Sequence, residues 1–347
     1  MKIVRDDGHR DHHVAELDGG EIIPSWEHPG RADIVDEVLD AGGPTAHEFV
    51  APDELDRGLV ERVHDGGYVS FLETAWGEWI ASGNTAESAM PYTWPTRRLR
   101  AVPPTTIQGR LGYYSFAADC SIGPATWRAV TASAATAQTA ADLVLGGDRV
   151  VFARCRPPGH HAATDQFGGY CYLNNAAIAA QRLRDRGHQR VAILDVDYHH
   201  GNGTQEIFWE RDDVVFGSIH ADPMVEFPYF LGHADEVGDG AGAGANHNVP
   251  LPHGTEADRW FTELDGLVKR ITPTAPTALV VSLGVDTFHE DPISKFRMES
   301  HDFDELGRRL ETIGLPTVIV MEGGYATAAL GDNIGRVISG FERQLAT

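Results

Sequence analysis

The chain has 347 residues, of which 42% are hydrophobic and 23% charged, and these values exclude wholesale disorder. Its 51 acidic and 28 basic residues give a formal net charge of -23, which argues against a broad basic face for nucleic acid. A cationic small molecule or a basic peptide would instead be attracted by such a surface.

The first 125 residues are irregular. Helical pieces are predicted at Ala32–Ala41 and Glu54–Ala75, and a Pro-rich stretch follows at Pro91–Pro104. The next stretch, Pro103–Pro124, carries Gly, Tyr and Phe with little periodicity. A long irregular segment such as 91–124 is usually functional or an interface. No Ser- or Gly-rich linker marks a boundary, so we expect one domain over residues 1–347.

From about residue 127, short β-branched runs alternate with longer helical patterns. Strands are predicted at Arg149–Cys155, Val191–Val196, Val214–Ile219, Ala278–Leu283 and Pro316–Met321. Helices are predicted at Thr126–Leu145, Asn174–Arg186, Glu256–Ile271, Asp302–Thr312 and Ala328–Gln344. Near-continuous apolar strands separated by helices indicate an α/β fold with a parallel sheet covered on both faces. In such sheets, functional sites lie beyond the carboxyl ends of the strands.

Three cysteines, Cys120, Cys155 and Cys171, are too few for a disulfide framework, and their spacing does not match a zinc finger. The first residues, Met1 to His13, are polar, and no apolar run reaches the roughly 18 residues needed to cross a bilayer. We therefore expect a cytoplasmic protein without membrane association.

The strongest chemical signal is the run ILDVDYHHGNGT, in which Asp195, Asp197 and His199 follow an apolar strand at every second position. Alternate strand residues point to one face, so the three side chains can converge. Carboxylate and imidazole together suit a divalent metal. The alternative is that these polar residues merely end a strand at the surface.

A second acid strengthens the metal interpretation. Asp286 follows the strand ALVVSL in the run SLGVDTF. Asp197, His199 and Asp286 would supply three protein ligands and leave a position open for water, which is the form of a catalytic site. Taken alone, Asp286 would more often be a helix cap.

Two further clusters also follow strands. The run RCRPPGHHA presents His160 and His161, which beside a metal would serve as general base and acid; the alternative is a pair of structural histidines. The run MEGGY ends in Tyr325, whose phenol could donate a hydrogen bond to a developing oxyanion. A tyrosine in this position is also often simply packed.

Five motifs stand in order along nearly the whole chain: RPPGHHA, FGGYCYLNNAA, ILDVDYHHGNGTQEIF, SLGVDTF and MEGGY. This set resembles the arginase–deacetylase superfamily, specifically its zinc-dependent, histone-deacetylase-like amidohydrolases. The stretches GYYSFAADCSIGPATW and SLGVDTFHEDPIS resemble the bacterial acetylpolyamine amidohydrolases. The resemblance implies a single α/β domain with the metal site at the carboxyl ends of the strands.

The resemblance also implies a role for each matched residue. The zinc ligands would be Asp197, His199 and Asp286, and the catalytic residues His160, His161 and Tyr325. Asp195 and Asn202 would orient the two histidines; Asn202 replaces an Asp found in some branches and would polarise His161 less. The acyl tunnel would be formed by Gly169, Tyr170, Phe227 and Ile293. A structural potassium site would lie around Asp195, Asp197, His199, Ser218 and Ile219.

The chain departs from the acetylpolyamine branch where substrate ammonium is bound. Asp119 stands where a Glu is expected, and the neutral Gln108 stands where a second acid is expected. Glu16 and Asp18 are candidates to replace the missing acid. Recognition of a small cationic substrate therefore rests on Asp119 first.

We expect a zinc-dependent amidohydrolase that converts an N-acetyl amide into acetate and a free primary amine, with an acetylpolyamine or acetyldiamine as substrate. Fe²⁺ or Co²⁺ could take the place of zinc. The alternatives are an acetyl-lysine deacetylase acting on proteins or small molecules, and a non-catalytic reader of acetylated ligands. The irregular segment 91–124 is expected to form a homodimer and to narrow the tunnel opening.

Overall fold

A parallel β-sheet runs through the centre of the molecule. The structure, a computed structural model, describes residues 1–42 and 46–345. Within these residues the sheet has eight strands in the order β4-β1-β5-β10-β9-β6-β7-β8, and each neighbouring pair is parallel. The strands, in sheet order, are Glu48–Val50, Lys2–Val4, Val150–Ala153, Thr317–Met321, Ala278–Leu283, Val191–Asp195, Val214–Ala221 and Asn246–Leu251. The predicted α/β class with a parallel sheet is confirmed.

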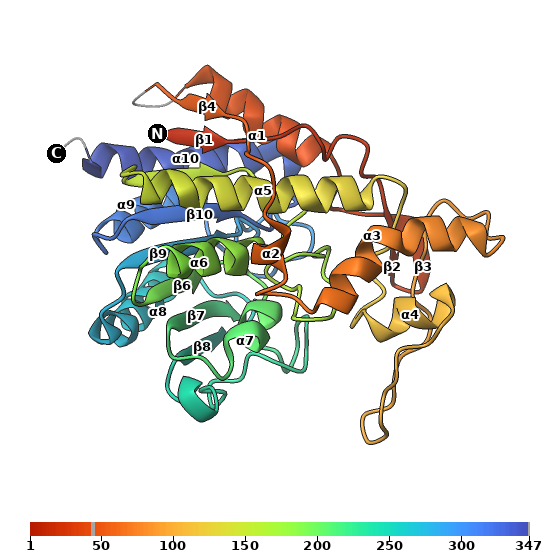
Figure 1. Cartoon of the computed structure of the whole chain (residues 1–347). Coiled ribbons are helices and arrows are strands. Elements are labelled where there is room, and N and C mark those ends of the chain that lie inside the picture. Colours follow the sequence, from red (N-terminus) through yellow and green to blue (C-terminus); the bar gives the residue numbers. More distant parts are fainter. Residues whose placement is uncertain (43–45, 346–347) are drawn as a thin grey trace.

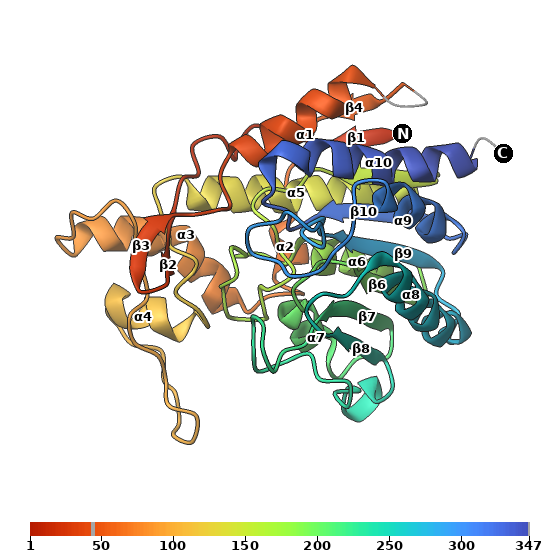
Figure 2. The same ribbon diagram turned by 180° about the vertical axis from the view of Figure 1, so that it is seen from behind.

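Helices cover both faces of this sheet (Figures 1 and 2). One face packs on α5 (Thr126–Leu145), α6 (Asn175–Asp185) and α7 (Asn202–Phe208), and α2 (Arg57–Val60) packs on α6. The other packs on α1 (Gly30–Ala41), α8 (Ala257–Ile271), α9 (Asp302–Glu311) and α10 (Thr327–Leu345). The helices α3 (Gly66–Ala81) and α4 (Ile107–Tyr113) pack on each other and lie to one side of the sheet. Two short 3₁₀ turns, Gly240–Gly242 and Thr272–Thr274, lie in connections. Within β5, Val151 faces the first core and Phe152 the second, as the two-residue period of a strand requires.

The predicted central strands and the long helices agree with the structure to within two residues. The start of α6 follows its sequence signal, since the Asn174 side chain accepts a hydrogen bond from the Ala177 amide at 2.9 Å. Its end does so too, because Gly187 follows the helix with φ of 111°. The strands β1, β4 and β8 were not predicted, because two have only three residues and β8 (NHNVPL) is an edge strand containing a proline.

Two predictions in the first third of the chain need correction. The helix predicted at Glu54–Ala75 is broken into α2 and α3, and Asp65 caps the second by accepting from the Gly67 and Tyr68 amides. The segment 91–124 is not irregular throughout, because α4 lies within it and buries Ile107 and Leu111. This helix was not predicted because the two glycines in its sequence, IQGRLGY, disfavour a helix and weaken its apolar pattern. An unpredicted hairpin, β2 (Ala15–Asp18) with β3 (Glu21–Pro24), packs separately from the main sheet.

Residues 91–106 form a projecting arm between α3 and α4, drawn in orange and yellow in Figure 1. The arm extends away from the sheet and exposes several large apolar side chains. Tyr92 is 70% exposed and Leu99 75%, and Trp94 and Val102 are also exposed. Such a group of apolar side chains is typical of an interaction surface.

Candidate active site

A pocket of about 180 Å³ lies at the carboxyl ends of the central strands. It is lined by Glu16, Leu17, Asp18, Trp26, Asp119, His161, Gly169, Tyr170, His199, Glu226, Phe227, Ile293 and Tyr325. All four residues predicted for the acyl tunnel are in this lining, together with Asp119 and both alternative acids, Glu16 and Asp18. The loops that follow β5, β6, β9 and β10 converge here because these strands are neighbours in the sheet.

A cluster of two carboxylates and one imidazole adjoins the pocket, and the imidazole of His199 is part of the pocket lining. Asp197, His199 and Asp286 each offer one ligand atom, and these atoms lie within 4.8 Å of one another. The His199 Nδ1 atom is 3.3 Å from Asp197 Oδ1 and 3.1 Å from Asp286 Oδ2. All three residues are buried. Oxygen and nitrogen donors at this spacing suit a divalent cation such as zinc.

Backbone contacts hold the two carboxylates in place. Asp197 Oδ2 accepts from the Gly323 amide at 2.8 Å, and Asp286 Oδ1 accepts from the Tyr198 amide at 2.8 Å. A side chain at Gly323 would place its Cβ 2.5 Å from both carboxylates, so only glycine fits between them. Burial and the charge of Asp197 raise the pKa of Asp286 above its usual range. Two buried carboxylates this close therefore call for positive charge between them, which a cation would supply.

The tandem histidines lie beside this cluster with their rings 4.0 Å apart. His160 Nδ1 is 3.0 Å from Asp195 Oδ2, and His161 Nδ1 is 2.7 Å from Asn202 Oδ1. The structure thus brings each histidine to the partner that the sequence resemblance implied. His161 is among the residues that line the pocket, and His160 is not.

The surroundings of the two histidines shift their pKa values in opposite directions. Burial lowers the pKa of His161 well below its ordinary value, and the neighbouring His160 and His199 lower it further. Burial opposes a charge on His160 as well, but Asp197 and Asp195 outweigh it and raise its pKa above its usual range. These opposite directions favour His161 as the proton acceptor of the pair.

Tyr325 lies at the pocket wall, on the turn that follows β10. The Asp291 carboxylate accepts from the Tyr325 amide at 2.7 Å, and the Arg31 guanidinium lies 4.7 Å from the Tyr325 ring centroid. Arg31 also donates to the carbonyl oxygens of Gly324 and Glu322, both at 2.7 Å. Burial raises the pKa of Tyr325 well above its ordinary value, so its hydroxyl keeps the proton that a donor needs.

Aromatic and backbone groups form the pocket wall. The Tyr170 ring lies 5.5 Å from that of Tyr325, and the Phe227 ring lies edge-on to His161 at 5.1 Å. Gly169 has φ of 57°, and an added Cβ would lie 2.2 Å from the His161 ring. A glycine is therefore required where the backbone passes closest to His161.

Acids line the outer part of the pocket. Asp119 Oδ1 accepts from the Gly169 amide at 2.9 Å, and Glu16 Oε1 accepts from the Tyr170 hydroxyl at 3.2 Å. Burial raises the pKa of Asp119 to about 6. Glu226 also lines the pocket and accepts from the Tyr198 hydroxyl at 2.8 Å. Gln108 is absent from the lining and instead lies 3.4 Å from the Ser82 hydroxyl.

The residues predicted for an inner cation site are also close together. Asp195 and Ser218 are paired in register on β6 and β7, and Ile219 follows Ser218 in the same strand. Asp195 Oδ1 accepts from the Asp197 amide at 3.1 Å. All of the residues predicted for this site are buried.

Sequence reasoning missed several residues of the site. Glu226 stands directly before Phe227, but a lone acid in a loop gives no signal of its own. Arg31 looks like a surface residue at the start of a helix, yet it is fully buried in an ion pair with Glu27 at 3.0 Å. Asp291, whose carboxylate accepts from the Tyr325 amide, lies in the run SLGVDTFHEDPIS. Its contact with Tyr325 becomes apparent only in the folded chain.

Comparisons with known proteins all point to one protein family. Residues 25–341 match the family model described as histone deacetylase domain. Acetylpolyamine amidohydrolase 2 of Pseudomonas aeruginosa is 51% identical over 99% of both chains. The acetylpolyamine amidohydrolase of Mycoplana ramosa is 48% identical over 98% of this chain and 99% of its own.

Similarity to solved structures extends over the whole chain. The crystal structure of acetylpolyamine aminohydrolase from Burkholderia pseudomallei superposes with a TM-score of 0.93, at 38% identity over 99% of both chains. The HD domain of HDA15 superposes with a TM-score of 0.81 at 24% identity, covering 99% of this chain and 90% of its own, which shows a shared fold.

Proposed function

Because the chain belongs to the histone deacetylase domain family, we propose that it hydrolyses the N-acetyl amide of a small polyamine or diamine to acetate and a free primary amine. The observation that carries this proposal is the pocket itself, which adjoins the carboxylate–imidazole cluster and has several acids in its lining. The acetylpolyamine amidohydrolases that resemble it over nearly their full length support the same substrate class.

We propose that Asp197, His199 and Asp286 hold one Zn²⁺, for which Fe²⁺ or Co²⁺ could substitute. Their carboxylate oxygens and imidazole nitrogen, all buried, fit such an ion. When bound, the metal would polarise the acetyl carbonyl and lower the pKa of water to about 7.

His161 is the proposed general base and acid. Its Nδ1–H donates to the Asn202 side-chain oxygen, which leaves Nε2 free to accept a proton from the attacking water. As the carbon–nitrogen bond of the amide breaks, His161 returns this proton to the leaving amine nitrogen. The charged His160, held by Asp195, stabilises negative charge near the reacting carbon.

Tyr325 is the proposed donor to the oxyanion. Its amide and its turn are fixed by Asp291 and Arg31, so the hydroxyl needs little reorganisation when the tetrahedral carbon forms. We also propose a structural K⁺ held by the groups around Asp195, Asp197, His199, Ser218 and Ile219. The positive charge of this ion would offset the negative charge of the buried carboxylates.

A substrate panel tests the proposed function. We expect N-acetylputrescine, N-acetylcadaverine and acetylspermidine to be hydrolysed with a higher kcat/KM than an acetyl-lysine peptide. Acetate release and amine release would be measured together, since both must appear in equal amounts. Preference for the peptide would favour the acetyl-lysine alternative, and binding without turnover of any substrate would favour a non-catalytic reader.

Asp119 is the proposed partner of the distal ammonium. Asp119→Asn should raise KM for N-acetylputrescine about tenfold, because a hydrogen bond between charged groups contributes roughly 1.5–3 kcal/mol and 1.4 kcal/mol is tenfold. The Asn oxygen can still accept from the Gly169 amide, so kcat should change little. A neutral N-acetyl alkylamine of equal length is the matched control substrate.

The same preference should depend on pH. Burial raises the pKa of Asp119 to about 6, so below that pH the carboxyl is protonated and loses its charge. The ratio of kcat/KM for the charged and neutral substrates should therefore shrink as the pH falls through about 6. Groups whose titration affects both substrates equally cancel in this ratio, so it reports on recognition of the ammonium. Equal values for both substrates at low salt would reject ammonium recognition.

We propose a homodimer formed through the segment 91–124. The projecting arm exposes Tyr92 and Leu99, and its Arg97 lies 5.2 Å from the ring centroid of the exposed Phe230. Light scattering should give about twice the chain mass of 37.7 kDa. Leu99→Asp should weaken the dimer, because a charge would then be buried at the interface. A wild-type monomer at working concentration would remove this proposal.

We also propose a reducing compartment such as the cytoplasm. Cys120, Cys155 and Cys171 are buried free thiols, a state that a reducing environment preserves. Among the described residues, no helix combines the length and apolar character needed to span a bilayer.

A further inference from the structure

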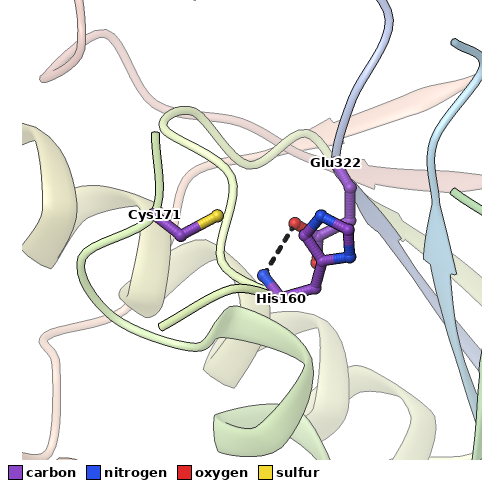
Figure 3. A group of neighbouring side chains, drawn as sticks. All are labelled: His160, Cys171 and Glu322. Carbon is purple, nitrogen blue, oxygen red and sulfur yellow. Dashed lines mark hydrogen bonds between the residues drawn. The ribbon is translucent and has the colours of Figure 1, made fainter. Parts of the chain in front are cut away.

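A fully buried carboxylate supports the loop that carries the tandem histidines. Glu322 is the first residue after β10, and its Oε2 atom accepts from the Gly159 amide at 2.7 Å and from the His160 amide at 3.2 Å. Figure 3 shows Glu322 reaching this loop, with a dashed line to His160. A side chain that directly follows β10 thus fixes the backbone of the loop that follows the neighbouring strand, β5.

Both sides of this contact are rigid. The Glu322 amide donates to Leu283 at 2.9 Å, and its carbonyl oxygen accepts from buried Arg31 at 2.7 Å. The His160 carbonyl oxygen accepts from the Gly203 and Thr204 amides, both at 3.1 Å. The backbone of His160 is therefore held on both sides: Glu322 accepts from its amide, and the Gly203 and Thr204 amides donate to its carbonyl oxygen.

The same carboxylate belongs to a second group of metal-type donors. His160, Cys171 and Glu322 offer atoms within 4.8 Å of one another, as Figure 3 shows. However, Glu322 Oε2 already accepts from two amides, and His160 Nδ1 already meets Asp195. Burial also raises the pKa of the Cys171 thiol well above its ordinary value, which keeps it protonated. Within this group, the hydrogen bonds that the Glu322 carboxylate makes go to the backbone of the histidine loop.

We propose that Glu322 is a positioning residue that sets the orientation of His160, and through it His161, for deacetylation. This inference rests on the proposed function. Glu322 is not among the residues that line the pocket, so it has no contact through which to bind substrate. Its loss should therefore lower kcat and leave KM close to that of the wild type.

Three variants test this assignment. Glu322→Ala removes both accepted hydrogen bonds, and the resulting displacement of the loop should lower kcat on the order of 10²-fold. Glu322→Gln keeps a side-chain oxygen that can accept from both amides, so it should recover most of kcat. Glu206→Ala is the matched control, because exposed Glu206 accepts from the Thr164 amide and hydroxyl, both at 2.8 Å, on the same loop. Its kcat should stay close to the wild-type value.

Zinc content and the urea midpoint would be measured for each variant, so that lost metal or lost fold is recognised. If Glu322→Ala does not fold, Glu322→Asp takes its place, because the shorter side chain withdraws the acceptor from the two amides. Unchanged kcat in Glu322→Ala, or equal losses in the Ala and Gln variants, would overturn the positioning role. Absence of turnover by the wild type would instead refute the proposed deacetylation.

Discussion

Dialysis of this protein against a chelator is expected to abolish hydrolysis of N-acetylputrescine, and added Zn²⁺ is expected to restore it. The reason is the cluster beside the pocket, where ligand atoms of Asp197, His199 and Asp286 lie within 4.8 Å of one another. Without a cation, the neutral His161 would face ordinary water, whose pKa is far too high for efficient deprotonation. Acetate release before and after metal addition is the measurement.

Substitution of the ligands should have the same effect as the chelator. Asp197→Ala and His199→Ala should bind zinc poorly and lose nearly all activity, because each removes one of three donors and leaves the others unbalanced. Asp239→Ala is the control, because Asp239 is exposed and does not line the pocket. This variant should keep both zinc and activity. A metal-free preparation with full activity would refute the proposed mechanism.

Tyr325→Phe is expected to retain the fold and the metal but to lose on the order of 10²–10³ in kcat, the usual effect of removing one oxyanion donor. The ring would keep its packing against Tyr170 and Arg31, so only the hydroxyl is lost. Steady-state kinetics with N-acetylputrescine would give kcat and KM separately, and KM should change much less than kcat.

The control for this substitution is Tyr113→Phe on α4, which removes a phenol outside the pocket lining and should leave kcat unchanged. Unfolding curves and zinc content would show that both variants are intact. Should Tyr325→Phe turn over at the wild-type rate, Tyr325 would be a packing residue and the oxyanion would need another donor.

The central strands were predictable because each is a short apolar run that ends at a motif. The burial patterns of β5, β6, β9 and β10 show why, since every residue of these strands is buried. Side chains buried on both faces of a sheet leave a continuous hydrophobic signature. The residues that follow these strands then converge because parallel strands end on one edge, so Asp197, His199 and Asp286 could be expected to meet.

The supporting residues could not be predicted in the same way. Arg31 acts on Gly324, and Glu322 acts on Gly159, over separations of 293 and 163 residues. Neither contact leaves a periodic or local signal, because it depends on which strands are neighbours in the sheet. The short strands β1 and β4 were missed for a related reason, since three residues are too few to show a period.

The position of β10 in the sheet has a consequence for synthesis of the protein. This strand is the last of the eight in the chain, yet it lies between β5 and β9. Until residues 317–321 leave the ribosome, β5 and β9 each present an unpaired edge that can pair with another chain. The nascent protein should therefore depend on late closure of its sheet, and a chain interrupted before β10 should aggregate.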